Sequence, residues 1–460
     1  MKRNADMTSD IAIPLMLGAI LPFIIVPFQL LQELSQKMLA EAPFGRDIQG
    51  YAVMFLIIAA LTLLQGELVA RLRIPDENPT LLKRSLQHGL KPVWTKVFIC
   101  VIAGCLCSFF SGAALGSEAP SVYLGALLAA LLGAKRYGRS PVRATRFMET
   151  GAAIGFSLAF ANPLAGVFMQ LNKDRSSRKD LSINLLTCTL SWIISSLLHG
   201  LLALIEGKNF LRGFLYSGIV FKTSTIAYLD LRYTYLTLLP ALLSLIVIPL
   251  LGYAVRFLRP TLSRDGGHLR MISPWLCAAI LFALFIVLPD SIGSGASYIQ
   301  NGVQIAEGNP LRLIILTGTR LLLTILCFST PILGGTIIPT IGLGSLLAAD
   351  LLPLFHWLPA DLAHSFIIAG GIASFIVATK KPLAGLALTL SFCPFLPAII
   401  NLVPAIALSS LILSIPGIPS LSRQMLQADL ATHLETDIYI GHHFQSKFNH
   451  GSLGGEEPGN

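Results

Sequence analysis

Charged side chains are scarce in this sequence. Asp, Glu, Lys and Arg make up only 12% of its 460 residues, whereas 54% are hydrophobic, and a soluble domain carries about twice that share of charge. The apolar residues form runs of membrane length, such as 11–31 and 51–64. The composition excludes an ordinary soluble domain and predicts an all-α polytopic membrane protein with roughly ten to fourteen spanning or partly spanning helices.

Patterns typical of disulfides and metal sites are also missing. The seven cysteines lie in or beside apolar runs, and the nine histidines show no spacing typical of metal ligands, so we predict no disulfide, no metal site and no cofactor. The net charge of +9 falls mostly in loops such as 135–146. Basic loops of this kind set membrane topology, and we expect the lipid bilayer rather than nucleic acid as a partner.

The chain contains an internal repeat. Shifted by 219 residues, 116–130 matches 335–349 at 8 of 15 positions, and 151–166 matches 370–385 at 7 of 16, where composition alone gives about one or two. Repeated membrane proteins of this kind are typically transporters or channels with a site between the halves. The repeat itself allows parallel or inverted halves.

The repeat predicts five segments along the chain. They are an N-terminal cytoplasmic segment, a first membrane half, a connecting segment, a second membrane half and a polar tail, at 1–10, 11–205, 206–232, 233–430 and 431–460 respectively.

Glu118 is the only charged residue between positions 97 and 133. One helix over that range would be about 55 Å long, well beyond the roughly 30 Å of the hydrocarbon core, so the chain must break inside it. Gly116 permits the break, Ser117 is suited to the N-cap and Pro120 to the first turn. A new helix is therefore predicted from Ala119 to about residue 132.

The second repeat copy has the same break, before Pro339, but carries Ile337 where the first carries Glu118. Two buried helix N-termini with unpaired N–H groups and positive dipole ends form ready anion sites. The candidate anion-binding residues at these two helix starts are Gly116, Ser117, Ala119, Thr336, Ile337 and Ile338.

Two interpretations of Glu118 remain open at this point. An ionised carboxylate can occupy the anion site as a tethered ligand and leave it when protonated, which makes Glu118 a gate that protons and competing anions operate. Alternatively, the carboxylate is a structural cap that only satisfies its own helix end.

Three short motifs resemble those of the CLC family of chloride channels and proton-coupled anion exchangers. Residues 116–120 are similar to its Gly-Arg-Glu-Gly-Pro, residues 334–339 to its Gly-Gly-Ile-Phe-Ala-Pro, and residues 161–166 to its Asn-Ala-Pro-Leu-Ala-Gly. Their order and spacing also match, so the resemblance covers about residues 15–430. It implies a homodimer, inverted halves whose broken helices meet with their N-termini near mid-membrane, and a gating glutamate at Glu118.

The sequence departs from the family at its other implied positions. The serine that helps to hold the central anion should lie near residues 71–80, where no serine is present, and Leu421 stands where the family has its pore tyrosine. The inner proton-transfer glutamate falls on Asn172 or Lys173, with Asp174 one residue further along. Lys173 either attracts anions to an inner vestibule or is an ordinary interfacial lysine.

The resulting hypothesis is an anion channel or transporter gated by Glu118, for chloride or a related small anion, in which proton coupling is in doubt. A transporter of a small organic anion that uses the same helix ends is the alternative. An intramembrane enzyme would need a partner acid, base or metal ligand for Glu118, and no second intramembrane carboxylate or histidine appears at useful spacing, so we predict no enzymatic activity. A non-conducting relative is a further alternative. The short tail and compact loops indicate a prokaryotic inner membrane.

Overall fold

The computed structural model describes most of the membrane region. The described residues are 2–41, 44, 47–72, 94–137, 141–170, 178–215, 234–263, 268–330, 332–392, 396–413, 415, 418–421 and 423–425.

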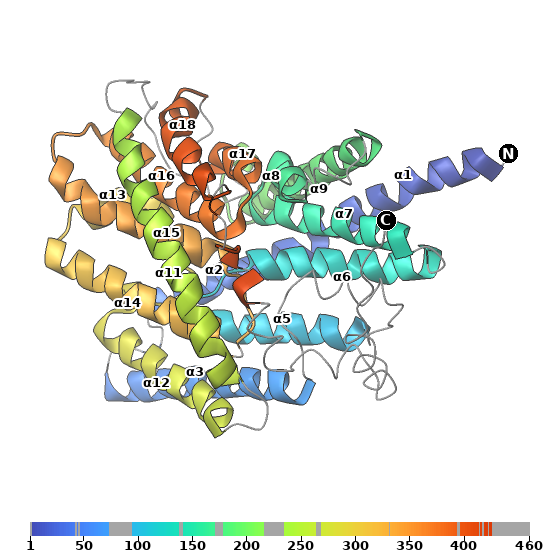
Figure 1. The fold of residues 1–460 in the computed structure, drawn as a ribbon. Coiled ribbons are helices and arrows are strands. Elements are labelled where there is room, and N and C mark those ends of the chain that lie inside the picture. Colours follow the sequence, from blue (N-terminus) through green and yellow to red (C-terminus); the bar gives the residue numbers. More distant parts are fainter. Residues whose placement is uncertain are drawn as a thin grey trace, which may run out of the picture.

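Within these ranges the chain forms helices that are joined by short turns and loops (Figure 1). The helices before residue 216 are α1 (Lys2–Ile20), α2 (Pro22–Glu41), α3 (Ile48–Leu72), α5 (Trp94–Ser111), α6 (Glu118–Tyr137), α7 (Pro141–Ala159), α8 (Pro163–Gln170), α9 (Arg178–Ile205) and α10 (Phe210–Leu215).

The later α-helices are α11 (Leu238–Ser263), α12 (His268–Val287), α13 (Ala296–Ala306), α14 (Pro310–Ser329), α15 (Ile337–Leu351), α16 (Ala360–Thr379), α17 (Pro382–Phe392) and α18 (Leu396–Ser410). Four short 3-10 helices accompany them, namely η1 (Thr234–Thr237), η2 (Pro289–Ser291), η3 (Leu352–Phe355) and η4 (Leu411–Leu413).

The number of apolar helices confirms the expected class. Among the described residues, seven helices are long and apolar enough to cross a membrane and five shorter apolar helices accompany them. These twelve fall within the range that the apolar runs predicted. Helices are the natural outcome because the hydrocarbon core offers no water to backbone N–H and C=O groups, which must pair inside the segment.

Helix starts recur at the spacing of the sequence repeat. Glu118 begins α6 and Ile337 begins α15, while Pro163 begins α8 and Pro382 begins α17; both pairs of starts are 219 residues apart. The members of both pairs also touch, α6 with α15 and α8 with α17, and α3 contacts α12. In Figure 1, α3 and α12 lie together at the base, and α6 and α15 extend to opposite sides of the centre.

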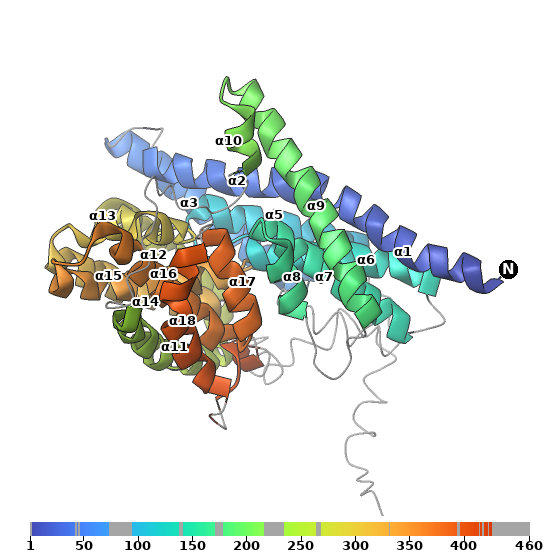
Figure 2. The same ribbon diagram turned by 90° about the horizontal axis from the view of Figure 1, so that it is seen from above.

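The ends of some elements differ from the prediction. The first helix begins at Lys2 rather than at residue 11, and α10 lies within the expected connecting segment 206–232. Figure 2 shows α10 packed beside α9, away from the centre of the molecule. The helix expected from Ala119 begins one residue earlier and extends past Gly133 to Tyr137, because a single glycine weakens a helix by only about 1 kcal/mol. The six described cysteines are buried and form no disulfide with one another.

The helix pair α6 and α7 packs backbone against backbone. A Cβ atom on Gly125 would collide with the carbonyl oxygen of Gly151, and a Cβ on Gly151 would collide with that of Gly125. The repeat copy has the same arrangement, since Gly344 and Gly370 meet in the same way between α15 and α16. Small residues of this kind allow membrane helices to approach closely, and each pair holds one of the two central helix starts in place.

We expect Gly151→Ala to destabilise the protein by about 1–3 kcal/mol, because the new Cβ overpacks a rigid backbone contact. The measurement is the melting temperature of the purified protein in detergent. The matched control is Gly318→Ala in α14, where a Cβ would meet no atom of the described residues within 4 Å. Equal melting temperatures for the two variants would contradict the close α6–α7 contact.

Candidate functional site: two opposed helix N-termini

Two loops bring the starts of α6 and α15 together. Gly116 N donates to Gly335 O at 2.8 Å and Gly335 N donates to Gly116 O at 2.6 Å, which makes a one-rung antiparallel bridge. The loop before α6 turns at Gly112, whose φ of +79° favours glycine. The N–H and C=O groups of Gly116 and Gly335 are thus paired across the two loops instead of within a helix, as a buried break requires.

Both helices start directly after this bridge. Ser117 O accepts from Ser121 N at 2.9 Å, and Thr336 O accepts from Thr340 N at 3.2 Å, so Ser117 and Thr336 both stand at N-cap positions. The Thr336 side chain makes no capping hydrogen bond. Two positive helix ends therefore face one buried region from opposite sides.

The Glu118 carboxylate lies between these helix ends. The side chain is 2% exposed, and its Oε2 atom accepts from Ile338 N at 3.4 Å. The backbone N–H groups of Ser117 and of Glu118 itself also lie beside the carboxylate. A negative group held by backbone N–H groups at helix N-termini occupies the position that a bound anion would take.

The site is too narrow for any side chain at Gly335. A Cβ there would lie 2.7 Å from Gly116 O, 2.8 Å from Glu118 Oε2 and 3.0 Å from Ala119 N. The bare Cα of Gly335 therefore fixes how closely the carboxylate approaches the second helix start.

The structure brings together most of the predicted anion-binding residues. Gly116, Ser117 and Ala119 lie at the first helix start, and Thr336, Ile337 and Ile338 at the second. Leu421 is instead buried in an apolar cluster that also contains Leu115. Asn172, Lys173, Asp174 and most of the stretch 71–80 lie outside the described residues.

Two polar side chains that the sequence did not single out hold the loop before α15. Gln65 Nε2 in α3 donates to Leu333 O at 3.2 Å and to Ser108 Oγ at 2.5 Å, and the Ser108 hydroxyl donates to Leu333 O. Both side chains are fully buried. The available signal was an amide and a hydroxyl inside apolar helices, where polar groups hydrogen-bond between helices.

Asn162 links the two repeat copies at the other matched motif. Its Oδ1 atom accepts from Leu164 N at 2.9 Å and Ala165 N at 3.1 Å, which caps α8, and its Nδ2 donates to Ala387 O of α17 at 2.7 Å. The cap needs Asn, Asp, Ser or Thr, and the amide of Asn162 also supplies the N–H donor to Ala387 O that an ionised Asp would lack.

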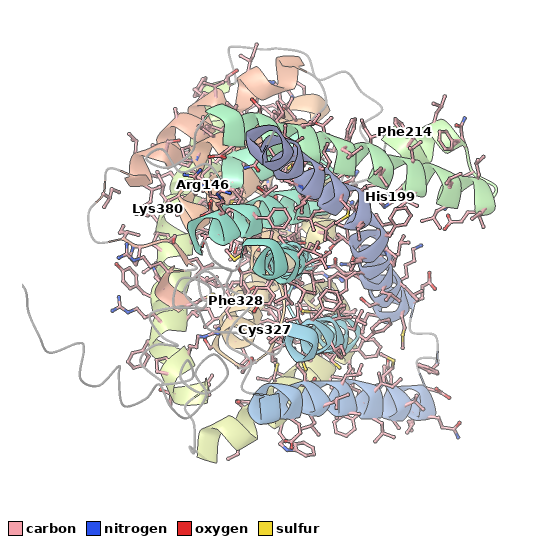
Figure 3. All side chains as sticks on the ribbon, turned by 90° about the vertical axis from the view of Figure 1, so that its right-hand side faces the viewer. Arg146, His199, Phe214, Cys327, Phe328 and Lys380 are labelled. Carbon is pink, nitrogen blue, oxygen red and sulfur yellow. The ribbon has the colours of Figure 1, made fainter. Side chains whose placement is uncertain are left out.

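The loop before α6 also rests on α14. Ala114 N donates to Cys327 Sγ at 3.4 Å, and Figure 3 shows Cys327 and Phe328 in the interior among the packed helices. Within the described part of the chain, no group of three His, Cys, Asp or Glu side chains could hold a metal ion.

The sequence model of the voltage gated chloride channel family matches residues 62–414. The chain belongs to this family. It is an integral membrane protein, and its curated relatives carry names of transporters rather than of enzymes.

Two curated relatives illustrate the similarity. The H(+)/Cl(-) exchange transporter ClcA of Klebsiella pneumoniae subsp. pneumoniae is 25% identical over 388 residues, which cover 82% of this chain and 79% of the relative. The ClcA of Yersinia pestis is 26% identical over 384 residues, covering 77% and 74%.

Solved structures share the fold at lower identity. A slow cyanobacterial Cl-/H+ antiporter superposes with a TM-score of 0.74 and 19% identity, covering 92% of this chain and 98% of that one. A CLC-type fluoride/proton antiporter gives 0.67 and 20%, covering 88% and 96%. The all-helical CLC-like fold expected from the motifs is confirmed.

We expect Gly335→Ala to displace the Glu118 carboxylate from Ile338 N, since the added methyl would lie 2.8 Å from Oε2. The change should lower the free energy of unfolding by about 1–3 kcal/mol. The melting temperature should fall with it. An experimental structure of the variant shows the carboxylate position, with Gly318→Ala as the control. An unmoved carboxylate and bridge would contradict the tight fit.

Proposed function

We propose that this protein moves a small inorganic anion, chloride in the first instance, across the membrane, and that Glu118 gates the path. The single observation that carries the proposal is the place of the Glu118 carboxylate, buried between two helix N-termini with Oε2 at Ile338 N. In this arrangement the ionised side chain is a tethered ligand in the position of the transported anion.

Competition explains how such a gate works. Backbone N–H groups and helix dipoles favour negative charge at this point, so an ionised Glu118 and a free anion exclude each other. Protonation removes the carboxylate charge and with it the attraction. The path is then open to the anion, and flux rises as the pH falls through the titration of Glu118.

The comparisons support the choice of ion. The curated relatives are named as H(+)/Cl(-) exchange transporters, and two of the similar structures are described as a Cl-/H+ and a fluoride/proton antiporter. Chloride and protons are thus the first pair to measure.

Two departures bear on selectivity and coupling. Leu421 offers no hydroxyl where the family places a tyrosine, so this anion site relies more on backbone N–H groups. Asn172 or Lys173 stands in the position of the inner glutamate, and Asp174 is the nearest acid. These three residues stay predicted members of an inner vestibule, and a simple two-glutamate proton route is not proposed.

Three further expectations belong to the same proposal. They are the two homologous halves at 11–205 and 233–430, a homodimer with one anion path per subunit, and a location in a prokaryotic inner membrane. The first draws support from the 219-residue spacing of equivalent helix starts.

The test is anion efflux from chloride-loaded liposomes that contain the purified protein, with the external pH recorded at the same time. We expect wild-type efflux to rise by up to about tenfold per pH unit of acidification while Glu118 titrates, since each unit changes the ionised-to-protonated ratio tenfold. Efflux through Glu118→Gln should be independent of pH, because the amide cannot ionise.

Glu307→Gln is the matched control, because Glu307 is an exposed carboxylate at the end of α13. It should behave as wild type. Proton movement driven by chloride efflux, and lost in Glu118→Gln, identifies an exchanger; efflux without it identifies a channel. Equal pH dependence in wild type and Glu118→Gln, or no efflux at all, refutes the gated anion path.

A further inference from the structure

A second buried charge lies outside the Glu118 site. Arg320 is in α14, one of the helices long and apolar enough to span the membrane, and its side chain is 0% exposed. Ionisable residues inside membrane-spanning segments are costly and usually functional, and the proposed gate makes no use of this one.

The hydrogen bonds of the guanidinium occupy only one of its edges. Nη1 donates to Ser291 O at 2.9 Å and to Gly293 O at 2.6 Å, and the carbon Cζ lies 5.4 Å from the centre of the Tyr298 ring. Among the residues that the structure describes, the Nε and Nη2 atoms have no hydrogen-bond partner. Together these atoms form the two-donor edge with which arginine grips anions.

No acid neutralises this arginine within the described part of the chain. Asp290 is close in sequence but pairs with Arg312 at 2.9 Å, and both of those side chains are more than half exposed. The ionisable neighbours that act on Arg320 are Tyr298 and Cys327, which are uncharged in their ordinary protonated forms. A cation buried in this way needs a counter-charge.

The free edge of Arg320 lies beside the start of α13, a helix of 11 residues. Its N-cap is Gly295, in the left-handed region at φ 86°, with no side-chain capping hydrogen bond. A Cβ on Gly295 would lie 2.8 Å from Arg320 Nη2. Ala296 N has only a 3.4 Å hydrogen bond, to Ser294 Oγ, so a positive helix end and a cation face one another.

We propose that the Nε–Nη2 edge of Arg320 and the first turn of α13 bind a small inorganic anion of halide size. Two neighbouring positive features that repel each other become mutually stabilising when one anion contacts both of them. The first turn of α13 lies at the molecular surface, because Ala296 is partly exposed and Ser297 is exposed.

This accessory site is separate from the Glu118 site but connected to it. Gly293, whose carbonyl binds Arg320, donates through its N–H to Gly112 O at 2.8 Å. Gly112 begins the loop that leads into Glu118. An anion at Arg320 therefore binds behind the loop that carries the proposed gate.

The test is a crystal structure of the full-length wild-type protein grown in bromide, with anomalous scattering used to locate the ions. We expect a bromide peak within hydrogen-bonding distance of Nε and Nη2 of Arg320. A water molecule at the two nitrogens, or no density beside them, overturns the proposal.

Paired variants assign the site to this side chain. Arg320→Gln should lose the peak, whereas Arg312→Gln, which removes an exposed charge nearby, should keep it. If Arg320→Gln does not fold, the wild-type bromide map alone decides. This result is independent of the liposome assay, because a protein without efflux can still show the Arg320 peak, and a gated transporter can lack it.

Discussion

Two backbone hydrogen bonds between Gly116 and Gly335 fix the geometry on which the candidate site depends. A helix break inside a membrane leaves N–H and C=O groups without partners, and each unpaired group costs free energy. This chain pairs the two breaks with each other. The same pairing sets α6 and α15 start to start, so that both positive helix ends face the Glu118 carboxylate.

Glycine positions extend this constraint into the helices. The Gly125–Gly151 and Gly344–Gly370 contacts let α7 and α16 press directly against α6 and α15. Helix association in lipid depends on such close packing because no hydrophobic effect drives it. Gln65 and Ser108 then anchor the loop before α15 at Leu333, and the two helix starts have little freedom to separate.

Each of the two buried charges, Glu118 and Arg320, lies beside backbone groups of opposite partial charge. Glu118 meets N–H groups and two positive helix ends, whereas Arg320 meets the carbonyl oxygens of Ser291 and Gly293 with one edge only. A carboxylate that is satisfied by the backbone can serve as a movable ligand. A guanidinium that is half satisfied attracts an anion to itself.

The sequence by itself determined the helical membrane class, the repeat, the break before Pro120 and the resemblance to the chloride channel family, because these depend on local composition and spacing. Only the tertiary structure decided which groups meet. The Gly116–Gly335 bridge, the reach of Glu118 to Ile338 and the half-satisfied edge of Arg320 join residues from 27 to 220 positions apart. Contacts of that kind depend on how helices pack, and no local pattern along the chain encodes them.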